Sequence, residues 1–497
     1  MNFKRLPIYL LVTLLVSSLA ACALPFNRPT QAPNPTQDNR VALTLTAIQV
    51  NSQATAAAQS TVQPPVATAA ATTVPATAVP TTAVPAVPTA TPTTPPVATT
   101  APAAVATVQV GAPAPVPAAS LEIVYTDAGR NLWIWLADGS TRQLVKTGDV
   151  YDGMISPDGS VLVYIRTKDF KKFSVWAINP NGSNDHEMIS QDDMKAMKNN
   201  DDAVGAQPYV ISWIPGTHHL AFVTSPTFDG PGLQVNDDLW EINVDTGELT
   251  EILEPGQGGI FYYSPDGKQI ALVTPKTISL INADGSNRRD SVLKFTPVNT
   301  YSEFLYYPTP KWAPDSSLLH VAIPPKDALA DPGEKTTLYE IPTDGSSAQK
   351  LGTVTTAPLL APEFSPDASR MIYVKVHGAA ADNQRELHLA DPNSSSDTVY
   401  RTAQLDFNGW APDSAHFLYT EGSDTFLGQI GVDAVRLLSD TRSATAVDWL
   451  QNGQIVFLHK ISNGWQIKLG APGGASEILI SLPGDPSNFM PNFAVKE

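Results

Sequence analysis

One short motif, repeated along the second part of the chain, constrains the fold more than any other feature. Its clearest copies are Ser156-Pro157-Asp158-Gly159 and Ser264-Pro265-Asp266-Gly267, and each is followed by an apolar run. Proline presets φ at the second position of a tight turn, aspartate suits the third, and glycine accepts the left-handed closing position. Each copy therefore predicts a β-hairpin.

The motif belongs to a larger repeating unit. Further copies lie at 213–216, 312–316, 364–368, 410–414 and 449–453, so that the copies recur about every 49 residues. A second turn, Asp-Gly-Ser in its clearest form, follows at 137–140, 283–286 and 343–346 after another predicted strand. Each unit thus has four strands, here A to D, with the Pro-Asp turn between A and B and the Asp-Gly turn between C and D. Tandem units of this kind are typical of β-propeller blades.

The two ends of the repeat region predict how the ring closes. Seven units carry the motif, whereas 121–146 supplies only strands B, C and D of an eighth unit. We expect the tail at 488–495 to supply the missing strand A. The fold class is therefore all-β, an eight-bladed propeller of four antiparallel strands per blade, with seven blades as the alternative.

In most copies an aromatic residue such as Trp312 or Phe364 ends strand A just before the Pro-Asp turn. The combination of this aromatic residue with Ser-Pro-Asp-Gly and Asp-Gly-Ser resembles the TolB-type propeller repeats, which are Pro-Asp relatives of WD repeats. It also resembles the propellers of prolyl oligopeptidase-like enzymes. The resemblance covers nearly all of 121–497 and implies protein or peptide binding as a class tendency. The regular placing of the aspartates indicates a turn role rather than catalysis; they are Asp158, Asp266, Asp315, Asp367 and Asp413.

The amino terminus has the charged, apolar and small-residue zones of a secretory signal at 1–21. Leu19-Ala20-Ala21-Cys22 resembles the lipobox of bacterial lipoproteins, and Cys22 is the single cysteine of the 497 residues. The resemblance implies cleavage after Ala21 and a lipid on Cys22. We therefore expect a protein anchored by lipid in the cell membrane and facing the extracytoplasmic side.

A long spacer is predicted between the anchor and the propeller. Residues 22–59 contain a short helical pattern, and 60–120 form a low-complexity Pro/Thr/Ala linker with 13 prolines between 63 and 118. Such a segment buries no core and predicts a disordered stalk, either a tether or a plain solvated linker. The first 120 residues hold Lys4, Arg5, Arg28, Arg40 and one acid, Asp38, a net +3, so the whole-chain charge of -17 leaves -20 on 121–497. An acidic propeller argues against nucleic acid as a partner.

The longest predicted connections are the B–C and D–A connections, which share one face of a propeller. Long loops gathered on one face usually carry the binding residues. The candidate binding residues there are Phe170, Phe173, Phe228, Asp229, Tyr301, Phe304 and Tyr306. They would anchor a protein or peptide partner at the cell envelope; alternatively, they pack the loops against the blades. Binding of a cell-wall or polysaccharide ligand through the same aromatics is a second hypothesis.

No nucleophile elbow, phosphate loop or His-Glu-x-x-His pair is present, so we predict a non-enzymatic binding module without catalytic residues, cofactor or metal. A third hypothesis is a metal-dependent propeller lyase using His377, His388 and His459. Ser190 begins a pattern that predicts a capped short helix inside a loop. The acidic residues around that helix do not follow a calcium-loop pattern. Nothing in the sequence predicts the oligomeric state.

Overall fold

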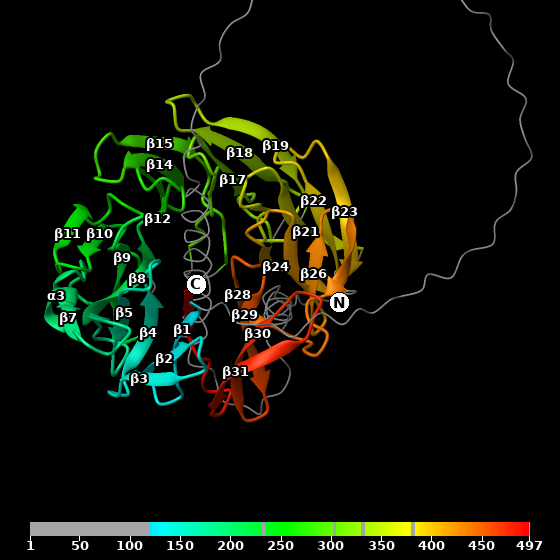
Figure 1. Cartoon of the computed structure of the whole chain (residues 1–497). Helices are drawn as coiled ribbons and strands as arrows, with labels where there is room; N and C mark the ends of the chain where they lie inside the picture. The colour runs from blue at the N-terminus through cyan, green and yellow to red at the C-terminus, as the bar shows by residue number, and fades with distance from the viewer. Residues whose placement is uncertain (1–119, 231–233, 302–304, 330–332, 379–382, 497) are drawn as a thin grey trace, which may run out of the picture. The chain divides into compact units, whose positions relative to one another are not determined.

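The computed structural model of the chain describes residues 120–230, 234–301, 305–329, 333–378 and 383–496. These residues form eight four-stranded antiparallel sheets arranged as the blades of a β-propeller (Figure 1). The predicted eight blades are confirmed, and the seven-bladed alternative is wrong. Several predictions concern residues outside the described ranges: the signal at 1–21, the lipid on Cys22, the helical pattern within 22–59, the Pro/Thr/Ala linker before residue 120, and Phe304.

The first four blades follow the chain from the described amino-terminal end. Blade 1 comprises β32 (Phe493–Lys496), β1 (Glu122–Thr126), β2 (Leu132–Leu136) and β3 (Thr141–Val145). Blade 2 comprises β4 (Val150–Ile155), β5 (Leu162–Arg166), β6 (Ser174–Ile178) and β7 (His186–Ile189). Blade 3 comprises β8 (Gly205–Trp213), β9 (His219–Thr227), β10 (Leu239–Asn243) and β11 (Leu249–Leu253). Blade 4 comprises β12 (Ile260–Tyr263), β13 (Gln269–Val273), β14 (Thr277–Asn282) and β15 (Arg289–Lys294).

The other four blades repeat the same strand order. Blade 5 comprises β16 (Lys311–Trp312), β17 (Leu318–Ile323), β18 (Thr336–Pro342) and β19 (Gln349–Val354). Blade 6 comprises β20 (Glu363–Phe364), β21 (Met371–His377), β22 (Gln384–Ala390) and β23 (Asp397–Ala403). Blade 7 comprises β24 (Leu405–Trp410), β25 (His416–Glu421), β26 (Asp424–Gln429) and β27 (Val432–Arg436). Blade 8 comprises β28 (Thr445–Trp449), β29 (Ile455–Ile461), β30 (Gly464–Gly470) and β31 (Ser476–Pro483).

The Pro-Asp turn is held by a hydrogen-bonded serine beneath it. Ser156 is fully buried, its Oγ donates to Asp158 Oδ1 over 2.6 Å, and the same Oγ accepts from the Val161 amide at 3.1 Å. Equivalent serine-to-aspartate bonds of 2.7 and 2.6 Å recur in blades 4 and 6. Gly159 closes the turn with φ at 76°, which explains the glycine. The recurring aspartates are therefore turn residues, as the sequence predicts.

Blade 1 joins the two ends of the propeller. The last strand, β32, pairs antiparallel with β1 and aligns Tyr125 with Phe493. The Thr126 amide donates to the Asn492 carbonyl over 3.0 Å, and Phe493 is only 6 % exposed. The predicted closure by the carboxyl-terminal segment is thus confirmed, because β32 occupies the strand-A position of the eighth blade.

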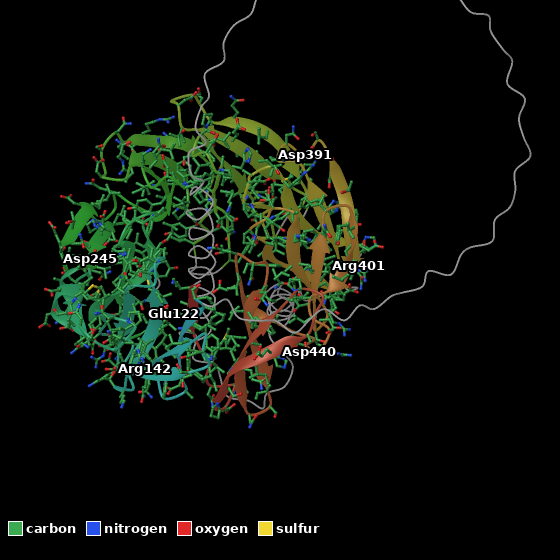
Figure 2. All side chains as sticks on the ribbon, viewed as in Figure 1. Glu122, Arg142, Asp245, Asp391, Arg401 and Asp440 are labelled. Atoms are coloured by element: carbon green, nitrogen blue, oxygen red, sulfur yellow. The ribbon has the colours of Figure 1, made fainter. Side chains whose placement is uncertain are left out.

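The apolar core lies between neighbouring blades, and its largest cluster spans blades 3, 4 and 5. Figure 2 shows charged side chains toward the outside of the ring, among them Arg142, Asp245 and Arg401, all of which are exposed. This distribution keeps the charge of the acidic propeller in contact with water.

One short helix interrupts the repeat. Helix α3 (Gln191–Ala196) begins at Ser190, which forms a reciprocal capping box with Asp193. Met194 is fully buried and fastens the helix to blades 2 and 3. The predicted capped helix is confirmed. Within the described ranges, no helix has the length and apolar character needed to cross a membrane.

Candidate functional site

The long connections gather at one end of the sheets in blades 2 to 6. They are 167–173, 190–204, 228–238, 295–310, 324–335 and 378–383, and all are of the B–C or D–A type. In blade 3 the B–C connection begins only at residue 228, because β9 continues to Thr227. In blades 7 and 8 the B–C connections shrink to 422–423 and 462–463. The D–A connections 437–444 and 484–492 are long as well, so the predicted asymmetry between the two faces is present around the ring, although the B–C connections are long only in some blades.

The two aromatic residues of 167–173 pack within the protein. Phe173 is 1 % exposed and belongs to the core of blades 2 and 3, so the structure corrects the expectation that it anchors a partner. Phe170 is half-buried, and the Arg130 guanidinium lies 4.9 Å from its ring centroid. The Tyr151 ring meets it edge-on at 5.9 Å. Phe170 therefore links blades 1 and 2.

The other candidates are more accessible. Phe228 is half-buried, and the neighbouring Asp229 is exposed and pairs with Lys171 Nζ at 2.6 Å. Tyr301 is 58 % exposed, and its hydroxyl donates to the Asp327 carboxylate over 2.7 Å. Leu305, from the same connection as Tyr301, is 63 % exposed. The connection 295–310 thus presents two large side chains to solvent.

Four tyrosines gather at this connection, two from the connection itself and two from neighbouring strands. Only Tyr306 of the four was among the predicted candidates. We define the tyrosine cluster as Tyr209 on β8, Tyr262 on β12, and Tyr306 and Tyr307 from 295–310. Three of them pack on the same apolar cluster of blades 3 to 5. All four are half-buried.

The electrostatics of the tyrosine cluster follow from its partial burial. Burial raises the pKa of Tyr209 to about 12. Burial, and then the negative charge of Asp237, raises the pKa of Tyr307. The pKa of Asp237 is itself raised to about 6 by burial and by neighbouring Asp238, an effect that Lys276 opposes. The cluster thus combines neutral phenols with the Asp237 carboxyl group, whose pKa lies close to neutral pH.

Three phenols of the cluster remain open to a ligand. Tyr209, Tyr306 and Tyr307 make no hydroxyl hydrogen bond to any other described residue, and none of these hydroxyls is fully buried. Tyr263 differs, because its hydroxyl is both unpaired and fully buried. The three accessible hydroxyls can therefore donate to, or accept from, a bound partner.

The predicted histidine trio is not assembled. His377 Nδ1 lies 2.7 Å from Glu386 Oε1, and His388 Nε2 lies 3.1 Å from Glu386 Oε2. His459 belongs to blade 8 instead, where its Nδ1 lies 3.3 Å from the Ser443 carbonyl. No group of three or more histidine, cysteine, aspartate or glutamate residues in the described ranges can hold a metal ion. The hypothesis of a metal site from these three histidines is wrong.

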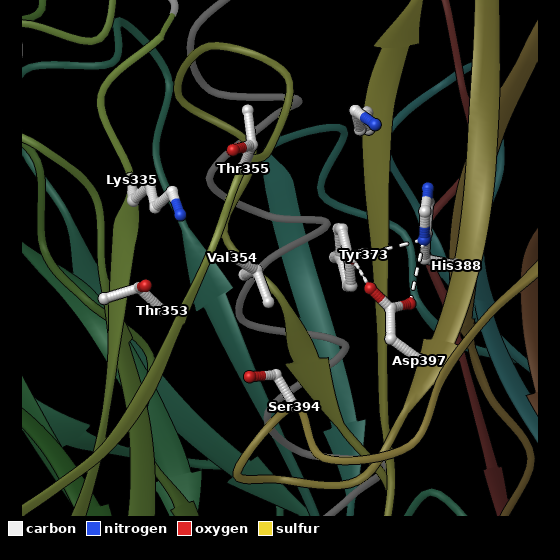
Figure 3. Close-up of a pocket in the computed structure, with 9 residues that line it drawn as sticks. Lys335, Thr353, Val354, Thr355, Tyr373, His388, Ser394 and Asp397 are labelled. Atoms are coloured by element: carbon white, nitrogen blue, oxygen red, sulfur yellow. Dashed lines mark hydrogen bonds and ion pairs between the residues drawn. The ribbon is translucent and has the colours of Figure 1, made fainter.

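A pocket of about 260 Å³ lies between the outer strands of blade 5 and the face of blade 6 (Figure 3). Tyr373, His388 and Asp397 form one wall and are joined by hydrogen bonds. The sequence reasoning missed Tyr373 and Asp397. An alignment of strand C across the blades would have exposed the site, because it places His388 where blade 2 has Trp176.

Comparisons with known proteins return only distant similarities. No family model and no curated protein matches the chain. A structure of oligogalacturonate lyase in complex with manganese is 15% identical, covering 69% of this chain and 82% of that chain, with a TM-score of 0.41. A prolyl endopeptidase structure is 16% identical, covering 68% of this chain and 50% of that chain, with a TM-score of 0.45. TolB from Acinetobacter baumannii is 15% identical, covering 57% of this chain and 64% of that chain, with a TM-score of 0.28.

The match therefore spans half of the endopeptidase and less than two thirds of TolB. The assignment of this chain to the β-propeller fold comes from its own strand pairing.

Proposed function

We propose that this chain is a lipid-anchored, extracytoplasmic propeller that binds a protein partner through the face of its long connections. The observation that carries the proposal is the tyrosine cluster, two members of which belong to the same connection, 295–310, as the exposed Tyr301 and Leu305. No residue of this face is assigned a catalytic role. The propeller acts as a rigid scaffold that presents the cluster.

Tyrosine suits this task for a physical reason. Its ring supplies a large apolar contact, its hydroxyl supplies a hydrogen bond, and only two side-chain torsions are ordered on binding. Half-buried tyrosines are already partly ordered, so less conformational entropy is lost. Tyr209, Tyr306 and Tyr307 have these properties, and Tyr301 and Leu305 extend the apolar surface.

Charge narrows the class of partner. The whole chain has a formal net charge of -17, and nearly all its charged residues follow position 120. Such a surface repels nucleic acid phosphates and anionic lipid head groups. A partner with a neutral or basic contact surface fits best.

The lipid anchor determines where binding takes place. Acyl chains on Cys22 would hold the protein at the membrane, since two chains give stable attachment where one is marginal. The Pro/Thr/Ala linker would give the propeller reach and a high local concentration near the membrane. Replacing Cys22→Ser should abolish labelling by radioactive fatty acid and release the chain from the membrane fraction. Unchanged labelling would contradict the anchor.

Partner binding can be tested by covalent cross-linking of the full chain in its native envelope, followed by mass spectrometry. Tyr301→Ala and Tyr306→Ala should each reduce capture of the same protein at least tenfold. Ile478→Ala is the matched control, because Ile478 is 49 % exposed on β31 of blade 8 and not in the blades that form the tyrosine cluster. Equal capture by all three variants, with unchanged thermal stability, would refute the proposal. Enrichment of a glycan instead of a protein would favour polysaccharide binding.

A further inference from the structure

The pocket beside blade 6 lies at a strand-C position that is a tryptophan in blades 1 to 3 and a histidine in blade 6. In blades 1 and 2 a tyrosine on strand B aligns with a tryptophan on strand C, as Tyr164 does with Trp176. Blade 3 has the same tryptophan opposite a phenylalanine. In blade 6 the tyrosine is Tyr373, and its partner is His388. His388 thus stands where blades 1 to 3 have an indole, whereas blades 4, 5 and 7 have Ser279, Tyr339 and Phe426 at this position.

The hydrogen bond from the strand-B tyrosine to an aspartate at strand D is the same in blades 2 and 6. Blade 2 therefore serves as an internal reference for blade 6. The Tyr164 hydroxyl donates to Asp185 Oδ1 over 2.5 Å, and the Tyr373 hydroxyl donates to Asp397 Oδ2 over 2.6 Å. Each aspartate lies at the start of strand D. Because an imidazole is smaller than an indole, His388 leaves open the space that the tryptophan fills in blade 2.

His388 is held rigidly in this place. Its ring stacks on Tyr373 with centroids 4.6 Å apart and an angle of 17°. Nδ1 lies 2.9 Å from Asp397 Oδ1, and Nε2 lies 3.1 Å from Glu386 Oε2. The side chain is 8% exposed, and both nitrogens are engaged. This wall is therefore preorganised, and it needs no rearrangement to receive a ligand.

The remaining walls supply cations and hydroxyl groups. Lys335 extends into the pocket from the 324–335 connection of blade 5 (Figure 3), and its ammonium group forms no ion pair with another described residue. Lys375 lines the pocket from β21 and pairs with Glu386 over 3.4 Å. The hydroxyl groups come from Thr353, Thr355 and Ser394. Asp397 is the single carboxylate in the lining, and its side chain remains 35% exposed.

We propose that this pocket binds a small hydroxylated anion, with its carboxylate or phosphate group at Lys335 and Lys375 and a hydroxyl group donating to Asp397. Ammonium groups attract such an anion, whereas they oppose a metal ion. A volume of about 260 Å³ suits a ligand of monosaccharide size, since drug-sized ligands need roughly 300–1,000 Å³. This site shares the 324–335 connection with the proposed protein-binding face, but its lining contains no residue of the tyrosine cluster.

The test is isothermal titration calorimetry on the full chain with three probes of similar size. Glucuronate presents a carboxylate, glucose 6-phosphate presents a phosphate, and glucose is the neutral control. We expect saturable binding of at least one anion and none of glucose. The anion that binds more tightly identifies the preferred group.

Two variants and one control locate the binding. Lys335→Met should weaken binding at least tenfold without changing thermal stability, because Lys335 is exposed. His388→Trp should abolish binding by filling the pocket as Trp176 does in blade 2. The control is Lys268→Met, at the opposite end of the sheets, where Lys268 is 79% exposed.

Each contrary outcome is decisive. Binding of glucose as tight as that of the anions would overturn the assigned ligand class. Equal weakening by Lys335→Met and Lys268→Met would show non-specific attraction and overturn the site. The absence of saturable heat with both anions at concentrations up to about 10 mM would also overturn it, since a dissociation constant of 1 mM corresponds to only about 4 kcal/mol.

Discussion

Closure of the ring by β32 makes Phe493 a sensitive position. The strand has four residues, and Phe493 is its one side chain in the buried core. It packs among apolar residues of blades 1 and 8, including Tyr125 and Trp465. Phe493→Ala should therefore loosen the contact that joins the two ends of the propeller.

The size of the effect follows from the burial. Phe493 is 6 % exposed, and truncation of a buried phenylalanine to alanine costs about 3–5 kcal/mol. With an unfolding entropy of about 2.1 cal/mol/K per residue over roughly 370 residues, a cooperative unfolding shifts Tm by about 4–6 °C. Phe261→Ala in blade 4 is the matched control, because Phe261 is 1 % exposed.

The two variants should differ in where the protein loosens. Hydrogen exchange followed by mass spectrometry should show that Phe493→Ala selectively loses protection in β1 and β32, since each blade contacts mainly its neighbours. Phe261→Ala should lose protection in blade 4 instead. A Tm shift below about 1 °C for Phe493→Ala would refute the closure argument. The same pattern of exchange in both variants would refute it as well.

Three other substitutions test local features. Ser190→Ala should destabilise helix α3 by about 1 kcal/mol through loss of the capping box, seen as faster amide exchange in 191–197. Gly428→Ala should cost about 1–3 kcal/mol in urea unfolding because a Cβ there overlaps the Phe417 ring, whereas Gly230→Ala meets open space and should be neutral. Histidine hydrogen bonds lower the pKa of Glu386 from 4.5 to about 2, so its stabilisation is complete above pH 4.5 and is lost as the pH falls toward 2. Glu386→Gln should therefore lower Tm at pH 7 and converge with the unmodified protein near pH 2; a constant difference would contradict this origin.

Much of the fold could be predicted because its signals are local. The Ser-Pro-Asp-Gly turn contains its own stabilising bonds, as between Ser156 and Asp158, so that each copy reports a hairpin independently. The capping box at Ser190 is local in the same way. Counting strands then showed that one blade lacked strand A, and β32 supplies it.

The candidate sites were harder to predict because they depend on contacts between distant segments. A loop aromatic has no local signal for burial, so the sequence left Phe173 as either a partner anchor or a packing residue, and its exposure of 1 % shows that it packs. The tyrosine cluster combines residues of β8, β12 and the 295–310 connection. The three histidines were grouped as a metal site only because they share a residue type. The structure places His459 in a different blade from the other two.

The sequence by itself determined the strand order and the turns, and it favoured eight blades closed by the carboxyl-terminal segment, because repeated local chemistry specifies these features. Only the tertiary structure decided which residues of the long connections remain accessible to solvent and where a cavity opens. Accessibility depends on how one blade packs against the next, and the pocket lies between the outer strands of blade 5 and an imidazole of blade 6 that takes the place of the indole of blades 1 to 3. Both are set by the space between segments that are distant in the chain.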